Sequence, residues 1–89
     1  MARKWVLVKD RLPEELVPVN ITWVNNDPPA YYRHIKGKKF VATGIYYDGS
    51  WYWYSVTCAD LLAEYGNNEP DRIDYAIDVI AWQPLPLPA

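Results

Sequence analysis

Residues 40–54 read FVATGIYYDGSWYWY, two runs of β-branched and aromatic residues on either side of Asp48-Gly49. An Asp-Gly pair between such runs indicates a β-hairpin, because a type I′ turn needs positive φ at both central residues. A turn at these residues predicts four cross-strand pairs: Tyr47–Ser50, Tyr46–Trp51, Ile45–Tyr52 and Gly44–Trp53. Trp53 would then lie over the bare backbone of Gly44, an arrangement that helps to fix the register.

Both faces of this hairpin are apolar, since side chains alternate between the two faces of a strand. One face, called here the Trp face, carries Trp51 and Trp53, and their large area predicts that it belongs to the core. The other, the Tyr face, carries three candidate protein-binding residues: Tyr47, Tyr52 and Tyr54. Either a helix or the N-terminal segment covers these tyrosines, or they form an exposed patch for a protein partner or a second copy of the chain.

Three further stretches predict extended structure. Apolar residues alternate over residues 17–24, as is typical of a strand with one buried face. Residues 77–82 read as a final strand, and residues 4–8 as a short extended segment. Prolines at 84, 86 and 88 alternate with leucines. Proline cannot donate to a sheet ladder, so this tail should lie over the surface outside the sheet.

One short helix is expected after the hairpin. Thr57 is the predicted N-cap, the helix would cover about residues 58–65, and Gly66 would end it. So short a helix has to pack on the sheet to be stable. The predicted fold class is therefore α+β: a small single domain over residues 1–89, with a mostly antiparallel sheet of three to five strands around the 40–54 hairpin.

Charge is distributed unevenly along the chain, although the net charge is only −2. Residues 1–39 hold eight basic and four acidic side chains, a balance of +4. Residues 40–89 hold one basic and seven acidic side chains, a balance of −6. We expect the two halves to attract each other across the fold, and the alternative is a functional basic patch.

The compartment is predicted from what the sequence contains. Cys58 is the one cysteine, so an internal disulfide cannot form and an oxidising compartment is not implied. The first residues have no apolar signal-peptide segment, and no apolar run reaches the length of a membrane span. These features predict a cytoplasmic protein without membrane contact.

Residues with catalytic chemistry are few. His34 is the one histidine, so a His-based metal pair or proton relay is not available. Cys58 and His34 could form a nucleophile and base, but Cys58 also fits the apolar face of the expected helix. Asp71, Asp74 and Asp78 recur at helical spacing, which a solvated acidic face explains more simply than a metal or acid–base site, since such a site needs carboxylates that converge in a pocket. We therefore expect no catalytic residue, no metal site and no cofactor.

Residues 31–39 are a candidate nucleic-acid-binding loop. Two tyrosines could stack on bases and four cations could bind phosphates. The candidate residues are Tyr31, Tyr32, Arg33, Lys36, Lys38 and Lys39. Against this reading stand the acidic pI of about 5.2 and the single basic residue of the second half.

Three stretches resemble one known family. The stretches are the opening WVLVKDRLPEE of residues 5–15, the central YDGSW of residues 47–51 and the closing VIAWQPLP of residues 79–86. They are similar to the domain-of-unknown-function family numbered 551. Ala81 and Gln83 stand where many members have His and Met. The resemblance implies a small protein of bacteriophages, prophages or gut bacteria, with no established activity and no catalytic residues to transfer. Its shared tryptophans would be core anchors: Trp5, Trp51 and Trp82.

The leading functional expectation is a non-enzymatic phage or prophage accessory protein in the cytoplasm of a bacterial host cell. It would act by binding another protein or a second copy of itself. The alternative is a nucleic-acid-binding module that uses the Tyr31–Lys39 loop. A third alternative is an enzyme that uses Cys58 or the aspartates.

Overall fold

The Asp48-Gly49 turn is present in the computed structural model, which describes residues 4–86. Asp48 has a φ of 45° and Gly49 a φ of 81°, the positive values that a type I′ turn requires. The turn joins strand β3 (Lys39–Tyr47) to strand β4 (Ser50–Trp53). All four predicted cross-strand pairs are observed, so the register of the hairpin is confirmed.

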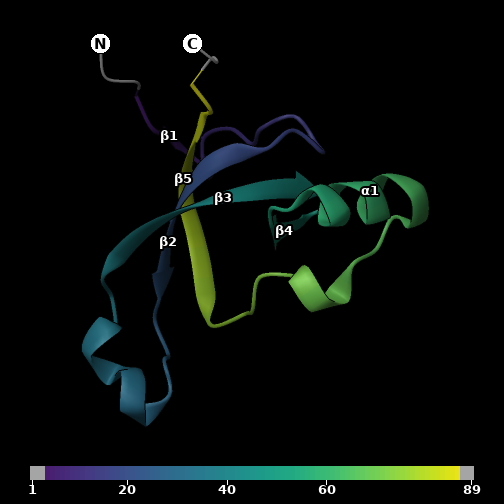
Figure 1. The fold of residues 1–89 in the computed structure, drawn as a ribbon. Coiled ribbons are helices and arrows are strands. Elements are labelled where there is room, and N and C mark those ends of the chain that lie inside the picture. Colours follow the sequence, from purple (N-terminus) through teal and green to yellow (C-terminus); the bar gives the residue numbers. More distant parts are fainter. Residues whose placement is uncertain (1–3, 87–89) are drawn as a thin grey trace.

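Five antiparallel strands form one sheet in the order β1-β5-β2-β3-β4. Besides the hairpin, the sheet contains β1 (Val6–Leu7), β2 (Val19–Asn25) and β5 (Ile77–Pro84). The sheet is strongly twisted, so that β3 crosses β2 and β5 in Figure 1. With one α-helix beside it, this sheet confirms the predicted α+β class.

The Trp face of the sheet carries one part of the core. Three buried side chains from the neighbouring strands β2 and β5 form it: Val19, Ile21 and Trp82. Trp51 and Trp53 pack against them and are half-buried. A Cβ atom on Gly44 would come within 2.9 Å of Ile21 Cδ1, so the absence of a side chain there lets β2 and the hairpin pack closely.

The Tyr face carries the other part of the core, because helix α1 (Val56–Tyr65) covers it. Four buried side chains meet between helix and hairpin: Ile45, Tyr52, Cys58 and Leu62. Both clusters contain side chains that are completely buried, such as Ile21 on the Trp face and Leu62 on the inner face of α1. The prediction that assigned the core to the Trp face is therefore incomplete.

The ends of α1 confirm one sequence prediction and correct another. Gly66 ends the helix with a φ of 71°, and its N–H donates to Leu62 O at 2.9 Å, as a left-handed C-cap does. The N-cap is Ser55, whose Oγ accepts from Cys58 N–H at 3.0 Å, and the predicted cap Thr57 lies inside the helix. Ser55 still has an extended backbone, the conformation that an N-cap needs.

Strand β5 is longer than predicted. It continues through Gln83 to Pro84, which pairs with Val19 at the beginning of β2. The prediction that the sheet ends at Trp82 is therefore wrong. Proline lacks the N–H donor, but at the end of a strand this loss is tolerated. The expectation for the last part of the tail, residues 87–89, lies outside the described residues.

Of the three tryptophans that the family resemblance marks as core anchors, one is buried. Trp82 is 7% exposed, and its indole N–H donates to Arg11 O at 2.8 Å. Trp51 is half-buried, and Trp5 is 38% exposed. The anchoring prediction therefore holds for Trp82, holds in part for Trp51 and is wrong for Trp5.

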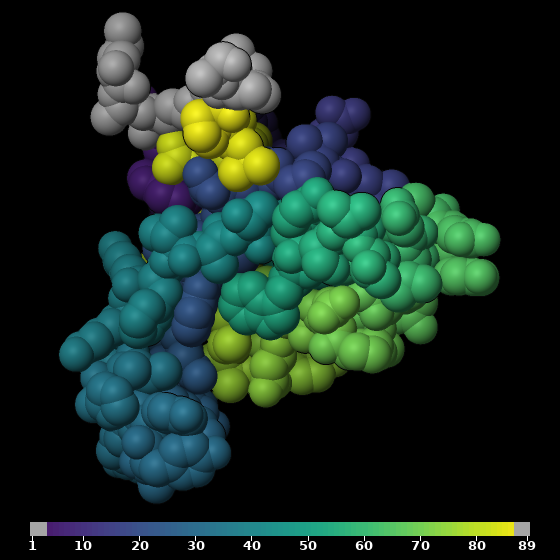
Figure 2. All heavy atoms as spheres, in the orientation of Figure 1, coloured from purple at the N-terminus to yellow at the C-terminus, as the bar shows by residue number. Residues whose placement is uncertain are grey.

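Two 3₁₀-helices lie outside the sheet. The first, η1 (Ala30–Ile35), lies between β2 and β3, where the sequence predicts a candidate nucleic-acid-binding loop, and the second, η2 (Glu69–Asp71), follows α1. Figures 1 and 2 show η1 as a lobe that projects from the end of β2 and the start of β3, away from α1 and η2. After η2 the chain runs along β4, where Ile73 N–H donates to Trp51 O at 2.9 Å.

We predict that Leu62→Ala lowers the free energy of unfolding by about 2–5 kcal/mol, because the side chain is 0% exposed and its removal leaves a cavity. Leu12→Ala is the matched control: it removes the same atoms from a side chain that is 45% exposed, and it should cost about 1 kcal/mol or less. Urea unfolding followed by tryptophan fluorescence measures both. Equal losses would show that α1 is not part of the core.

Candidate functional site

The three tyrosines of the Tyr face do not form an exposed patch. Tyr52 is 5% exposed beneath α1, and Tyr47 is half-buried against the same cluster. Tyr54 is 36% exposed but lies beyond the end of β4. The helix therefore covers Tyr52 and part of Tyr47, which is one of the two alternatives that the sequence left open. The other alternative, an exposed tyrosine patch on the hairpin, is wrong for Tyr52, and Tyr47 and Tyr54 do not form a continuous patch without it.

Burial also changes the acidity of Tyr52. Desolvation of the phenolate raises the pKa of Tyr52 above its ordinary value of 10.0. The Arg72 guanidinium opposes this rise, because a nearby positive charge favours the phenolate. Arg72 lies beside Tyr52 through a β-bridge that the chain forms as it returns along β4.

The six candidate nucleic-acid-binding residues lie together. Tyr31, Tyr32 and Arg33 are in η1, and Lys36, Lys38 and Lys39 follow at the return to β3. All six are exposed. Tyr31 is 76% and Tyr32 51% exposed, and their ring centres are 4.6 Å apart with an angle of 57° between the planes. We call residues 31–39 the basic loop.

The cations of the basic loop are not neutralised by neighbouring carboxylates. The sequence contains no Asp or Glu from residue 28 to residue 47. Within residues 4–86, the ion pair that forms joins Arg72 to Glu69 at 3.6 Å, and it lies in the second half of the chain. The expected attraction between the two halves is thus not realised as ion pairs among these residues.

Next to the basic loop lies a pair of adjoining hollows, which we call the acidic groove. The larger, of about 750 Å³, lies between the Asn25–Pro29 corner and the segment that enters β5. The smaller, of about 320 Å³, continues from there to the end of the hairpin. Both are lined by Asp74, Tyr75 and Asp78, and the larger also by Asp27.

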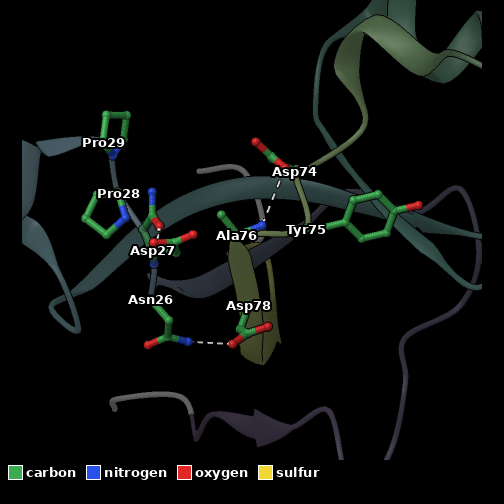
Figure 3. Close-up of a pocket in the computed structure, with 9 residues that line it drawn as sticks. Asn26, Asp27, Pro28, Pro29, Asp74, Tyr75, Ala76 and Asp78 are labelled. Atoms are coloured by element: carbon green, nitrogen blue, oxygen red, sulfur yellow. Dashed lines mark hydrogen bonds between the residues drawn. The ribbon is translucent and has the colours of Figure 1, made fainter.

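Figure 3 shows how the carboxylates of the acidic groove are held. Asn26 points toward Asp78, and its Nδ2 donates to Asp78 Oδ2 at 2.6 Å. Asp74 Oδ1 accepts from Ala76 N–H at a longer 3.4 Å. Asp27, Asp74 and Asp78 are all exposed, so the groove presents negative charge to solvent. Tyr75 points away from Pro28 and Pro29.

The smaller hollow also has apolar walls. Trp51 lies on one side, Ile73 follows along β4, and Ile77 and Val79 come from β5. Tyr75, on the rim, is 88% exposed, and the Arg72 guanidinium lies 5.4 Å from its ring centre. The groove thus combines three carboxylates with a half-buried indole and an exposed phenol ring.

The residues considered for catalysis are not brought together. Cys58 is 0% exposed on the inner face of α1, whereas His34 is exposed on η1. Figure 1 shows η1 before the start of β3 and α1 near the other end of that strand. Asp71 lies in η2, where its carboxylate accepts from Asn68 Nδ2 at 2.7 Å, whereas Asp78 lies in strand β5. Because the two residues belong to different elements, the aspartates do not share a helical face. Among residues 4–86, no group of three or more His, Cys, Asp or Glu residues is placed to hold a metal ion.

Sequence reasoning missed the acidic groove as a unit. It noted the spacing of Asp74 and Asp78, but gave no reason to place them beside Asp27. Asp27 is far away in sequence and enters the groove only because the Asn25–Asn26 corner is bonded to the segment before β5, with Asn26 N–H donating to Ala76 O at 3.1 Å. The only local signal was the excess of acidic residues in the second half.

Comparisons of the chain with protein-family models, with curated proteins and with solved structures found no match in any of the three. In the described part of the chain, no helix has both the length and the apolar character that crossing a membrane requires. The surfaces therefore have to be interpreted from their own chemistry.

We predict that Tyr52→Phe flattens the loss of stability at alkaline pH. Because the pKa of Tyr52 is raised in the folded state, the unfolded chain loses this proton first as the pH rises above 10.0. The free energy of unfolding that this group contributes is fully present below pH 10.0 and declines above it. Removing the hydroxyl removes this contribution. Urea unfolding on both sides of pH 10 measures it, and Tyr31→Phe, at an exposed ring, is the matched control. Identical pH profiles for both variants would contradict the prediction.

Proposed function

We propose that this chain is a non-enzymatic binding protein that holds a basic, partly apolar segment of a partner protein in the acidic groove. The observation that supports it best is the juxtaposition of three exposed carboxylates with Trp51 and Tyr75 along one continuous depression. Aromatic side chains at the edge of a depression are the usual anchors of protein interfaces.

The charge of the groove defines the partner. Asp27, Asp74 and Asp78 come from two separate segments and have no Lys or Arg partner among the described residues. A lysine or arginine of the partner would complete them, and such complementary charges favour the correct partner and repel acidic ones. Arg72 also lines the smaller hollow, but it is paired with Glu69 at 3.6 Å. The three carboxylates therefore leave the groove negative, and it suits a segment that carries positive charge.

The apolar walls define the remainder of the contact. Trp51 is half-buried already, so covering its outer edge costs little side-chain entropy while removing apolar area from water. Ile77 and Val79 face the same hollow from β5. A leucine or aromatic residue beside the partner's basic residue would fill this space.

The biological setting follows from the family resemblance. Residues 5–15, 47–51 and 79–86 resemble a family of small phage, prophage and gut-bacterial proteins, which suggests an accessory protein in the cytoplasm of a bacterial host cell. The wide separation of Cys58 from His34 supports a binding role over catalysis.

A selection from a displayed library of random short peptides tests this proposal. Peptides enriched on the purified protein should carry Lys or Arg next to Leu, Phe or Trp. We predict that Asp74→Asn weakens their binding by about tenfold, since it removes the charge while its amide oxygen can still accept from Ala76 N–H. Trp51→Ala should weaken it at least as much.

Asp60→Asn is the matched control for the peptide experiment. It makes the same change at an exposed carboxylate on α1, outside the groove, and should leave peptide binding unchanged. Enriched peptides without basic residues, or peptides that bind Asp74→Asn as tightly as the original protein, would contradict the proposal.

A further inference from the structure

The basic loop has features that the proposed groove does not use. Its four cations are exposed and have no carboxylate partner among residues 4–86. Its two tyrosines are among the more exposed aromatic side chains of the described chain. Exposed aromatic rings are costly to leave in water, and uncompensated cations attract polyanions, so this combination requires an explanation of its own.

We propose that the basic loop is a second site, which binds single-stranded nucleic acid. Arg33, Lys36, Lys38 and Lys39 would contact successive phosphates, and Tyr31 and Tyr32 would stack on unpaired bases. Cations that follow the backbone, combined with aromatic rings for the bases, are the general means by which proteins bind single strands. No residue of the loop lines the acidic groove, so the two sites can be tested separately.

The geometry of the two rings favours a single strand over a duplex. Their planes are inclined at 57°, so they cannot both lie parallel to one continuous stack of bases. Each ring can instead take one base of a strand whose bases are splayed apart. Such bases are available in a single strand and not in a duplex.

The acidic groove gives a second reason for this preference. Asp27 directly precedes Pro28 and Pro29, which lead into η1, so the acidic groove begins next to the N-terminal end of the basic loop. A duplex, with two phosphate chains and a large diameter, would bring phosphates toward these carboxylates. A single strand can follow the cations of the projecting lobe and stay away from the groove (Figure 2).

The test is the binding of a fluorescent oligothymidylate, measured by fluorescence anisotropy at several salt concentrations. If four cations contact phosphates, log Kd should change with log salt with a slope of about 2.8, since each contact contributes about 0.7 for single strands. Lys36→Gln combined with Lys38→Gln should reduce this slope to about 1.4. Lys4→Gln combined with Lys9→Gln removes the same charge at exposed positions outside the loop, and should leave the slope unchanged.

Stacking is tested separately from charge. Tyr31→Ala should weaken binding of the oligonucleotide by about tenfold without changing the salt slope, because it removes a ring and no cation. Tyr65→Ala is the matched control at a ring that is 69% exposed on α1, and it should have no effect. Asp74→Asn, which weakens the proposed peptide contact, should not weaken binding of the oligonucleotide.

Four outcomes would overturn the inference. The first is the absence of oligonucleotide binding at low salt, and the second is a reduction of the salt slope in the Lys4/Lys9 control equal to that in the Lys36/Lys38 variant. The third is a loss of affinity with Tyr65→Ala equal to that with Tyr31→Ala. The fourth is binding of a duplex or of polyglutamate as tight as that of the single strand. The last outcome would show a general attraction for polyanions, or an acidic protein as the ligand. None of these outcomes bears on the peptide site, because the groove variants are measured with a different ligand.

Discussion

A β-hairpin with large apolar side chains on both faces has to be covered on both faces, and this constraint arranges the rest of the chain. On the Trp face, β2 and β5 extend the sheet and supply Ile21 and Trp82. On the Tyr face, α1 supplies Cys58 and Leu62. A short helix gains its stability from such packing and not from its own hydrogen bonds. The helix and the hairpin thus depend on each other.

The same constraint explains a strained residue. Leu16 has a φ of 66°, a conformation that costs a non-glycine residue about 1 kcal/mol or more. Its side chain packs against the cluster beneath α1, and its N–H donates to Tyr46 O at 3.0 Å. Beside it, Glu15 Oε2 accepts from Asp48 N–H at 2.6 Å. The contacts of Leu16 with the hairpin offset the strain and close the open end of the Tyr face.

Features set by neighbouring residues were predictable from the sequence, and features set by distant residues were not. The Asp48-Gly49 turn and the end of α1 at Gly66 depend on backbone conformations that few residues adopt, so a local pattern identifies them. The burial of Tyr52 could not be derived, because alternation along β4 is the same whether a helix covers that face or water does. Pro84 was excluded from the sheet by a general rule, yet β2 is long enough to pair with it.

The candidate sites show the same division. The basic loop is continuous in sequence, so its residues could be gathered from the sequence alone. The acidic groove joins residues that lie far apart in the chain, so it could be identified only from the fold. Composition revealed that charge is asymmetric, but not that the two signs would meet at one end of the sheet.

These surfaces of opposite sign stay separate because the corner between them is rigid. Asn25 O accepts from Gly37 N–H at 3.1 Å, which closes the basic loop at its base, and Asn25 Oδ1 accepts from Asp27 N–H at 3.0 Å. Pro28, which is buried, and Pro29 then restrict the backbone between groove and loop. If this segment were flexible, the lysines could fold back onto the aspartates and neutralise both surfaces. Holding them apart leaves both charged surfaces exposed, at the cost of the mutual attraction that would otherwise stabilise the fold.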